Sequence, residues 1–369
     1  TIGYTQRYAA TAQAGYAVTV WVPDYPNPPD MGAEPNWPFA LRRIPMHGTR
    51  GWGDRVALAQ EILSGTPPFR DCILHIAEPG PLATMLYLQW LPLVLSHRLI
   101  LTLHGSDILL FSALPHRKLL MRRLLRRAEC IHVLSRYNAE LLKARFPEAA
   151  PKLRCIPGAP RELVKKHIVA DSPAPEQPPE TEPSERVILL TVGRIHPRKG
   201  QQMVIEALQQ LPEALQAQIE YWVAGPVVNR AYMRRLQALG HESPFEVRFF
   251  GAVSQEMLDT LYAQADIFVM ASQQQGNSIE GFGLSYIEAS AVGLPVVGFR
   301  TGGVEDAIRE GETGLLAEAG DIAGLSRALQ ELIEQPERRK QLGANGFRFA
   351  SSLSWHDTAC ALYGDAPHS

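Results

Sequence analysis

Apolar and polar positions alternate with two different periods along this chain. Short runs of β-branched and other apolar residues predict strands, and between them apolar residues recur with helical spacing. In the first half the expected strands are residues 17–22, 72–76, 99–103 and 130–134, with helices at 117–127 and 138–146. In the second half the expected strands are 187–192, 220–224, 247–250, 267–271 and 295–298, with helices at 201–211, 231–239, 254–264, 284–292 and 322–334. This alternation is typical of βαβ units, so we predict an α/β fold with parallel sheets.

One segment interrupts the pattern and divides the chain. Residues 171–185 contain five prolines, five acidic residues and no large apolar side chain, which predicts an extended linker. Residues 1–170 carry 21 Lys and Arg against 12 Asp and Glu, or +9, whereas residues 171–369 carry 15 against 26, or −11. We therefore expect an N-terminal domain over 1–170 and a C-terminal domain over 186–352. Two such domains imply a cleft between them, with ligands at the carboxyl ends of the strands.

Composition and missing motifs exclude several classes of protein. The 369 residues carry 36 Lys and Arg against 38 Asp and Glu, and a net charge of −2 gives no footprint for nucleic acid. No signal peptide and no apolar run long enough to span a membrane is visible, so we expect a cytoplasmic protein. The dinucleotide-binding, Walker, zinc-protease and nucleophile-elbow motifs are all absent from the sequence. The cysteines lie far apart, which suits a reducing compartment and predicts no metal site; they are Cys72, Cys130, Cys155 and Cys360.

A basic loop follows directly on the strand expected at 187–192. It runs from Gly193 to Gly200 and contains Arg194 and Lys199. An arginine fork and a lysine ammonium on a strand-to-helix loop can clamp a diphosphate, and Gly193 lets the backbone come close to it. The alternative is a basic loop that is only solvated.

A second candidate lies between the strand at 267–271 and the helix at 284–292. Glycines at a helix start expose backbone N–H groups, which together with the helix dipole bind anions. One carboxylate precedes this point and another follows it, as if to hold the two ends of one nucleotide-sugar. The alternative for each carboxylate is a favourable interaction with the helix dipole alone. The residues concerned are Glu280, Gly281, Phe282, Gly283, Leu284 and Glu288.

These motifs together resemble those of the GT-B glycosyltransferases of family GT4. The loop from Gly193 to Gly200 and the paired carboxylates Glu280 and Glu288 resemble two of the family's elements. The stretch around His104 resembles its N-domain histidine loop, and residues 301–305 with 311–314 resemble its downstream segment. The resemblance is strongest over 186–352 and weaker over about 70–165. It implies two Rossmann-like domains that face each other across a cleft.

The resemblance also implies how the donor is bound. In this family Arg194 and Lys199 would hold the donor diphosphate and offset the charge that grows on the departing nucleotide. The amides around Gly283 and Leu284 would hold phosphate. The expected donor-binding residues are Gly193, Arg194, Lys199, Glu280, Gly281, Phe282, Gly283, Leu284 and Glu288.

Further roles follow from the same resemblance. Glu288 would bind the ribose hydroxyls, and Glu280 those of the donor sugar. His104 would lie against the donor sugar near the acceptor, unless it is a core histidine at a strand end. We expect Asp107 to be a helix N-cap. His196, Arg198 and Asn277 lie near the site by position alone, and the expected catalytic residues are His104, Arg194, Lys199 and Glu280.

The reaction implied is hexosyl transfer with retention of anomeric configuration, without a metal or other cofactor. The donor is a nucleotide-diphosphate sugar, and the acceptor is a glycan, a lipid-linked saccharide or a small molecule. Two alternatives remain open: a nucleotide-sugar epimerase or phosphorylase-like enzyme, and a non-catalytic module that binds sugar nucleotides.

Three further expectations concern the acceptor side and the chain ends. The run from Arg117 to Arg127 has an apolar stripe and a basic face. It is either an ordinary core-facing helix or a contact with anionic membrane at the inner face. Residues 353–369 predict a terminal helix that crosses back to the N-terminal domain. The family's first strand and glycine-rich loop find no counterpart before residue 17, so we expect them to be absent from this chain.

Overall fold

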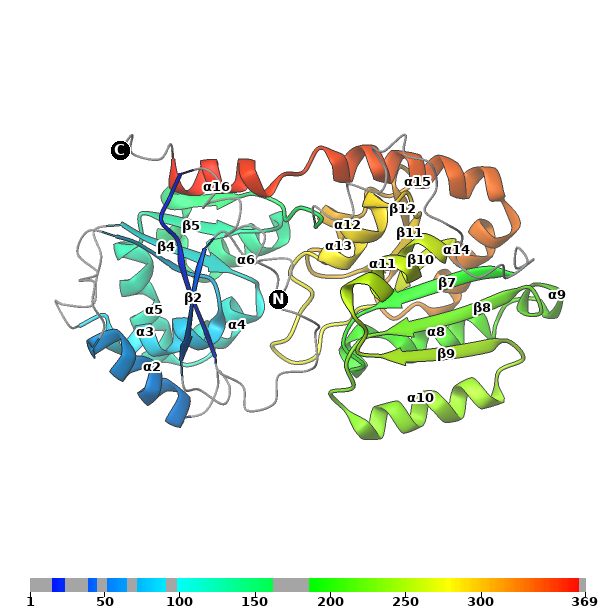
Figure 1. Cartoon of the computed structure of the whole chain (residues 1–369), viewed down its shortest axis with the longest axis horizontal. Helices are drawn as coiled ribbons and strands as arrows, with labels where there is room; N and C mark the ends of the chain where they lie inside the picture. Colours follow the sequence, from blue (N-terminus) through cyan, green and yellow to red (C-terminus); the bar gives the residue numbers. More distant parts are fainter. Residues whose placement is uncertain are drawn as a thin grey trace. The chain divides into compact units, whose positions relative to one another are not determined.

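The computed structural model describes residues 15–23, 39–44, 52–64, 72–90, 98–161 and 186–364 (Figure 1). Its contacts divide the chain into two compact units, Thr1–Gly158 with Ser354–Ser369, and Ala159–Leu353. The boundary at residue 158 lies before the expected end of the N-terminal domain at 170. The linker predicted over 171–185 and the start of the chain before residue 15 lie outside the described residues.

The second unit is built on a six-stranded parallel sheet. Its strand order, β12-β11-β10-β7-β8-β9, is that of the doubly wound Rossmann fold, with the order reversing between β7 and β10. In such sheets ligands bind at the carboxyl ends of the strands on either side of that reversal. The strands are β7 (Val187–Val192), β8 (Ile219–Ala224), β9 (Glu246–Gly251), β10 (Ile267–Met270), β11 (Val296–Arg300) and β12 (Gly314–Glu318).

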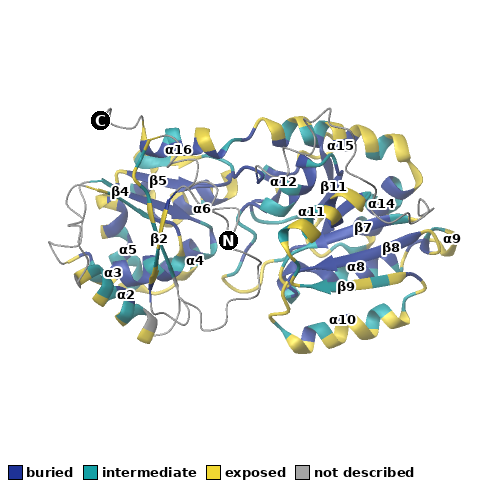
Figure 2. Ribbon diagram, in the orientation of Figure 1, coloured by how far each residue is buried: buried dark blue, intermediate teal, exposed yellow. Residues whose placement is uncertain are grey.

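Helices cover both faces of this sheet, and this is why its strands read as continuous apolar runs. In β10 alternate residues face opposite ways: Ile267 and Val269 join the large core, whereas Phe268 packs on Tyr262 and Tyr286 from the other side. Figure 2 shows the inner strands of the sheet largely buried and the outer helix faces exposed, whereas the edge strand β9 is half-buried to exposed. The helices are α8 (Gln201–Leu208), α9 (Glu213–Gln216), α10 (Arg230–Glu242), α11 (Gln255–Gln264), α12 (Leu284–Ala291), α13 (Val304–Ala307), α14 (Ile322–Glu334) and α15 (Pro336–Ser351), with a 3₁₀ turn, η3, at Pro197–Lys199.

The first unit has a four-stranded parallel sheet in the order β3-β4-β5-β6 and a separate parallel pair, β1-β2. Its core is formed by the sheet and the helices α3 to α6. The strands are β1 (Thr19–Pro23), β2 (Ala40–Ile44), β3 (Ile73–Ile76), β4 (Arg98–Leu103), β5 (Cys130–Val133) and β6 (Leu153–Cys155). The helices are α2 (Trp52–Ser64), α3 (Pro79–Leu88), α4 (Ser106–Ser112), α5 (Pro115–Arg127), α6 (Arg136–Arg145), the 3₁₀ helix η2 (Pro147–Lys152) and the terminal α16 (Trp355–Tyr363).

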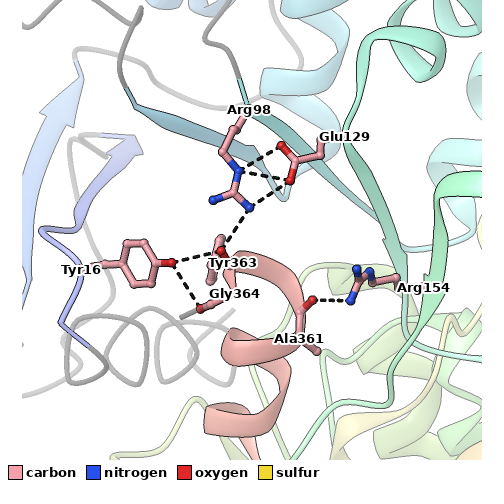
Figure 3. Close-up of polar contacts among 7 residues, drawn as sticks. All are labelled: Tyr16, Arg98, Glu129, Arg154, Ala361, Tyr363 and Gly364. Atoms are coloured by element: carbon pink, nitrogen blue, oxygen red, sulfur yellow. Dashed lines mark hydrogen bonds and ion pairs between the residues drawn. The ribbon is translucent and has the colours of Figure 1, made fainter. Parts of the chain in front are cut away.

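The terminal helix α16 packs on this first unit, as Figures 1 and 3 show. Its last carbonyls have no partner within the helix and are met by cations from the sheet. Arg98 donates to the Tyr363 carbonyl at 3.1 Å, and Arg154 donates to that of Ala361 at 2.7 Å. Glu129 holds the Arg98 guanidinium at 2.9 Å. Positive charge at a helix C-terminus is favourable, so these contacts hold the helix end by charge as well as by geometry.

A chain of hydrogen bonds runs from α16 through the sheet. The Tyr363 hydroxyl lies 2.6 Å from His75 Nδ1, and His75 Nε2 lies 2.7 Å from the Thr102 hydroxyl. That hydroxyl lies 3.1 Å from His132 Nδ1, and His132 Nε2 lies 2.9 Å from the Ile156 carbonyl. Because a carbonyl only accepts, His132 Nε2 must donate. With both imidazoles neutral, each earlier group then donates to the next, starting from Tyr363.

We predict that Tyr363→Phe lowers the free energy of unfolding by about 1–3 kcal/mol, since it removes the hydroxyl that donates to the half-buried His75 ring. Urea unfolding followed by circular dichroism measures the change. Tyr137→Phe, on the exposed surface of α6, is the matched control. Equal stability of the two variants would show that the hydrogen-bond chain does not anchor α16.

Candidate functional site

The candidate donor loops lie at the reversal of strand order in the second unit. The loop from Gly193 to Gly200 follows β7, and residues 271–283 follow β10. Because β7 and β10 are adjacent parallel strands, both loops leave the same edge of the sheet. The sequence predicted that each loop follows a strand, and the structure shows that the two strands are neighbours and joins the loops through side chains.

The basic loop is held in a tight 3₁₀ turn. The His196 ring accepts the Arg198 backbone N–H at 3.1 Å through Nδ1, and the Arg198 carbonyl accepts the Gln273 N–H at 2.8 Å. Gly200 has φ +70°, and a Cβ there would lie 1.8 Å from the Ala271 carbonyl oxygen. Only glycine lets the β7 loop lie this close to the end of β10.

One carboxylate joins the two loops. Glu280 Oε2 lies 2.6 Å from Lys199 Nζ, 3.0 Å from Arg198 Nη1 and 3.1 Å from the Ser272 hydroxyl. Arg198 and Lys199 are buried, and the Glu280 side chain is 12% exposed. Arg194 lies on the same loop with an exposed side chain. We call these four groups, Arg194, Arg198, Lys199 and Glu280, the Glu280 cluster.

The charged groups of the Glu280 cluster shift one another's pKa values. Burial alone would raise the pKa of Glu280, but Lys199, Arg198 and the hydrogen bonds to the carboxylate outweigh it and lower that pKa to about 2. Burial lowers the pKa of Lys199, and Glu280 opposes this. Burial and the neighbouring arginines also lower the pKa of His196, which keeps its ring neutral. Arg198 and Lys199 together outweigh the one carboxylate between them, so the cluster carries surplus positive charge and attracts anions.

The start of α12 lies beside this cluster. Gly283 precedes the helix with φ +94°, and a Cβ there would lie 2.6 Å from the Tyr286 ring. The Gly303 N–H donates to the Glu280 carbonyl at 2.8 Å, which fixes the backbone before the helix. Phe282 is buried, so it has a packing role. A helix N-terminus next to a net positive cluster is a site for phosphate groups.

Glu288, one turn further along α12, belongs to a different network. Its Oε1 lies 3.2 Å from Arg161 Nε, and Oε2 accepts the Tyr262 hydroxyl at 3.2 Å. Arg161 Nη2 also contacts Asp259 at 3.0 Å. Burial raises the pKa of Glu288, and Arg161 opposes this. The two carboxylates of the sequence motif are therefore held by separate sets of cations.

His104 lies in the first unit, between β4 and α4. Its Nε2 lies 2.7 Å from the Ala77 carbonyl, so this nitrogen donates. The expectation that Asp107 is a helix N-cap is wrong: the N-cap of α4 is Gly105. Asp107 is instead buried inside the helix, where its carboxylate accepts the N–H groups of His104 and Ile108. Burial raises the pKa of Asp107, which the contacts with His104 oppose. Asp107 thus holds the His104 backbone.

Several residues of these networks were not predicted from the sequence, among them Arg198, Ser272 and Arg161. Arg198 stood near the site by position alone, and the structure brings it onto Glu280. Ser272 and Arg161 were not singled out. The position of Ser272 directly after the β10 run was a usable signal, because strand ends form the site. No local signal in the sequence pointed to Arg161, because its partner Glu288 lies 127 residues away.

The described residues contain neither a candidate metal site nor a candidate membrane-spanning helix. No group of three or more His, Cys, Asp or Glu among them could hold a metal ion. Within that same part of the chain, no helix has the length and apolar character needed to cross a bilayer.

Two family models match this chain. The model of the glycosyl transferases group 1 matches residues 174–349, and that of glycosyltransferase family 4 matches residues 8–159. The chain belongs to the family 4 glycosyltransferases. The two matches fall on the two units of the structure, and the enzyme class expected from the motifs is confirmed.

Relatives of this glycosyltransferase are known by sequence and by structure. It is 28% identical over 276 residues to a GDP-mannose-dependent phosphatidylinositol monomannoside mannosyltransferase of Mycolicibacterium smegmatis, covering 72% of this chain and 69% of the relative. It is 35% identical over 187 residues to a D-inositol 3-phosphate glycosyltransferase of Thermomonospora curvata, covering 49% and 42%.

Two solved structures share the fold of this glycosyltransferase. Sucrose-phosphate synthase of Thermosynechococcus elongatus has a TM-score of 0.73 at 23% identity, covering 98% of this chain and 90% of that one. Anabaena HepE in complex with UDP and glucose has a TM-score of 0.71 at 17% identity, covering 97% and 93%. The predicted GT-B class with two Rossmann-like domains is confirmed.

The lowered pKa of Glu280 predicts how the stability of this glycosyltransferase depends on pH. The folded value of about 2 lies below the ordinary value of about 4.3, so the stabilisation is complete above about pH 4.5 and is lost as the pH falls towards 2. Glu280→Gln should therefore cost about 3 kcal/mol of unfolding free energy at pH 6, and its difference from the wild type should shrink as the pH falls to 2. Urea titrations at several pH values measure this. Glu337→Gln, exposed on α15, is the control, and a pH-independent difference at Glu280 would contradict the assignment.

Proposed function

We propose that this glycosyltransferase moves a hexose from a nucleotide-diphosphate sugar to its acceptor, with retention of configuration and without a metal ion. The observation that carries the proposal is the Glu280 cluster beside the start of α12, at the reversal of strand order. Surplus positive charge beside the first N–H groups of a helix suits a diphosphate in both charge and geometry.

Each group then has a distinct task. Arg194 and Lys199 bind the diphosphate and offset the negative charge that builds up as the bond to the hexose breaks. Backbone N–H groups around Gly283 and Leu284 share that charge. These donors are fixed before the reaction starts, and electrostatic preorganisation of this kind is usually the largest catalytic term. Because protein cations neutralise the leaving group, the mechanism needs no metal to do so.

The carboxylates recognise the two ends of the donor. Glu280 binds hydroxyls of the hexose, while Lys199 and Arg198 keep it ionised. Glu288 binds the ribose hydroxyls. The motif places no carboxylate of the site as a nucleophile, so we propose that an acceptor hydroxyl attacks on the face that the leaving group departs from, through an oxocarbenium-like transition state. The new bond from the hexose to the acceptor oxygen replaces its bond to the diphosphate, and the hydroxyl proton leaves with the diphosphate. His104 acts on the acceptor side.

The named relatives support particular substrates. One is GDP-mannose-dependent and acts on a phosphatidylinositol monomannoside, and the other is a D-inositol 3-phosphate glycosyltransferase. We propose GDP-mannose as the first donor to test and inositol-containing or lipid-linked saccharides as the first acceptors. A thermal-shift panel of GDP-, UDP- and ADP-hexoses identifies the donor, since a ligand at 100 times its Kd adds about 2.7 kcal/mol of stability.

Arg194→Ala and Lys199→Ala should each lower turnover at least tenfold, because each removes a cation that stabilises the departing diphosphate. Steady-state release of nucleoside diphosphate measures the rate, and circular dichroism verifies the fold. Lys340→Ala, on the exposed face of α15, should leave turnover unchanged, as should an excess of chelator. Wild-type turnover in either site variant would refute the clamp.

A basic and apolar surface on the first unit supports a membrane-bound acceptor. On α5, Met121 and Leu124 face the core, whereas Leu119 is 68% exposed. Trp90, after α3, is 58% exposed, and the Arg123 guanidinium lies 3.8 Å from its ring centroid. Exposed aromatic and leucine side chains among basic residues suit the interface of an anionic bilayer. We propose that α5 and Trp90 contact the inner membrane face.

Sedimentation with vesicles tests this contact. The chain should partition more strongly into vesicles containing anionic lipid than into zwitterionic ones, because each basic residue near the surface adds about 1 kcal/mol. Changing Arg117, Lys118 and Arg126 together to Glu should abolish the difference. The matched control changes three exposed arginines of α10 to Glu, namely Arg230, Arg234 and Arg235. Equal partitioning of the wild type into both vesicle types would end the membrane proposal.

A further inference from the structure

Arg161 is a buried arginine at the start of the second unit. It is 2% exposed and lies three residues after the boundary between the units. Its Nε contacts Glu288 Oε1 at 3.2 Å, and its Nη2 contacts Asp259 Oδ1 at 3.0 Å. A guanidinium is planar and rigid, so two such contacts fix its orientation.

The Glu288 carboxylate is held from both sides. Arg161 contacts one of its oxygens, and the Tyr262 hydroxyl donates to the other at 3.2 Å. Tyr262 is buried and stacks on Phe268 of β10, with ring centroids 6.2 Å apart. Asp259, which holds Arg161, also accepts from Gln255 at 3.2 Å. These contacts therefore fix the orientation of the Glu288 side chain.

This arrangement is poorly explained by stability alone. Buried ion pairs often contribute less than apolar residues of the same volume, because both charges lose their hydration. Arg161 in addition has one nitrogen, Nη1, that is buried without a hydrogen-bond partner among the described residues. An unsatisfied buried donor is unfavourable. A costly arrangement of this kind is expected at functional sites.

Arg161 also favours the ionised form of Glu288. The described groups that face the carboxylate are Arg161, Tyr262 and, through Arg161, Asp259. Arg161 is the cation among them, and it acts against the burial that favours the protonated acid. Without this cation, burial and the nearby Asp259 would both favour protonation, which removes the acceptor capacity of the carboxylate.

We propose that Arg161 is a positioning residue for the nucleoside of the donor, holding Glu288 ionised and oriented so that it accepts the ribose hydroxyls. The inference rests on the proposed function, in which Glu288 binds ribose. The inference implies that Arg161, in the segment that joins the two units, affects the affinity for the donor. Arg161 acts through Glu288, and its effect falls on binding of the nucleotide rather than on the chemical step.

Calorimetric titration of the full chain with GDP and with UDP, between pH 5.5 and 8.5, tests the inference. The wild-type Kd for the nucleotide that binds should be nearly constant over this range. In Arg161→Met the Kd should rise at least tenfold at pH 6 and recover towards pH 8.5, because Glu288 must lose its proton before it can accept. Arg161→Lys, which restores a cation, should return a flat profile.

Two further variants separate the possible outcomes. Glu288→Gln should bind weakly at every pH, and Arg338→Met, which removes an arginine paired with Glu331 on another face, should behave as the wild type. If Arg161→Met binds with wild-type affinity, or loses affinity equally at every pH, the role of Arg161 is overturned. That outcome leaves Glu288 in place as the ribose ligand. Wild-type affinity in Glu288→Gln, or no nucleotide binding by the folded wild type, would overturn the proposed function itself.

Discussion

One carboxylate oxygen, Oε2 of Glu280, contacts Arg198, Lys199 and Ser272 within 3.1 Å. Two cations buried next to each other repel, and each has lost its hydration, so they are stable only with an anion between them. Glu280 supplies that anion and at the same time ties the loop after β7 to the loop after β10. Because Glu280 lies between the cations, the cluster is stable without a ligand. Because it still carries surplus positive charge, it attracts an anionic one.

The sheet order determines where this cluster forms. In the order β12-β11-β10-β7-β8-β9, the sequence order of the strands reverses between β7 and β10, and in doubly wound sheets ligands bind at such a reversal. Gly200 lets the first loop pass close to the end of β10, and the Gly303 N–H holds the second through the Glu280 carbonyl. The start of α12 then lies beside the cations. Fold, charge and backbone donors all contribute to one site.

Much of the fold and part of the site could be predicted from the sequence. Parallel strands buried on both faces read as unbroken apolar runs, which is why β7 and β10 were located closely. The strand β2 was missed because Arg42 and Arg43 interrupt its apolar run. Lys199 and Glu280, which the structure brings into contact, could be singled out because they follow strands within recognisable spacings. Arg198 and Arg161 depend on tertiary contacts: a 3₁₀ turn directs the one onto Glu280, and the other meets a carboxylate far along the chain. No local pattern encodes either contact.

The central claim is that the Glu280 cluster and the start of α12 receive the diphosphate of a nucleotide-sugar. A crystal structure of the full chain with bound GDP-mannose, or with whichever hexose donor the thermal-shift panel selects, tests it most directly. We expect diphosphate oxygens within hydrogen-bond distance of Arg194, Lys199 and the first amides of α12, with Glu280 contacting the hexose. A diphosphate bound elsewhere, with the Glu280 cluster unaltered and exposed to water, would contradict it.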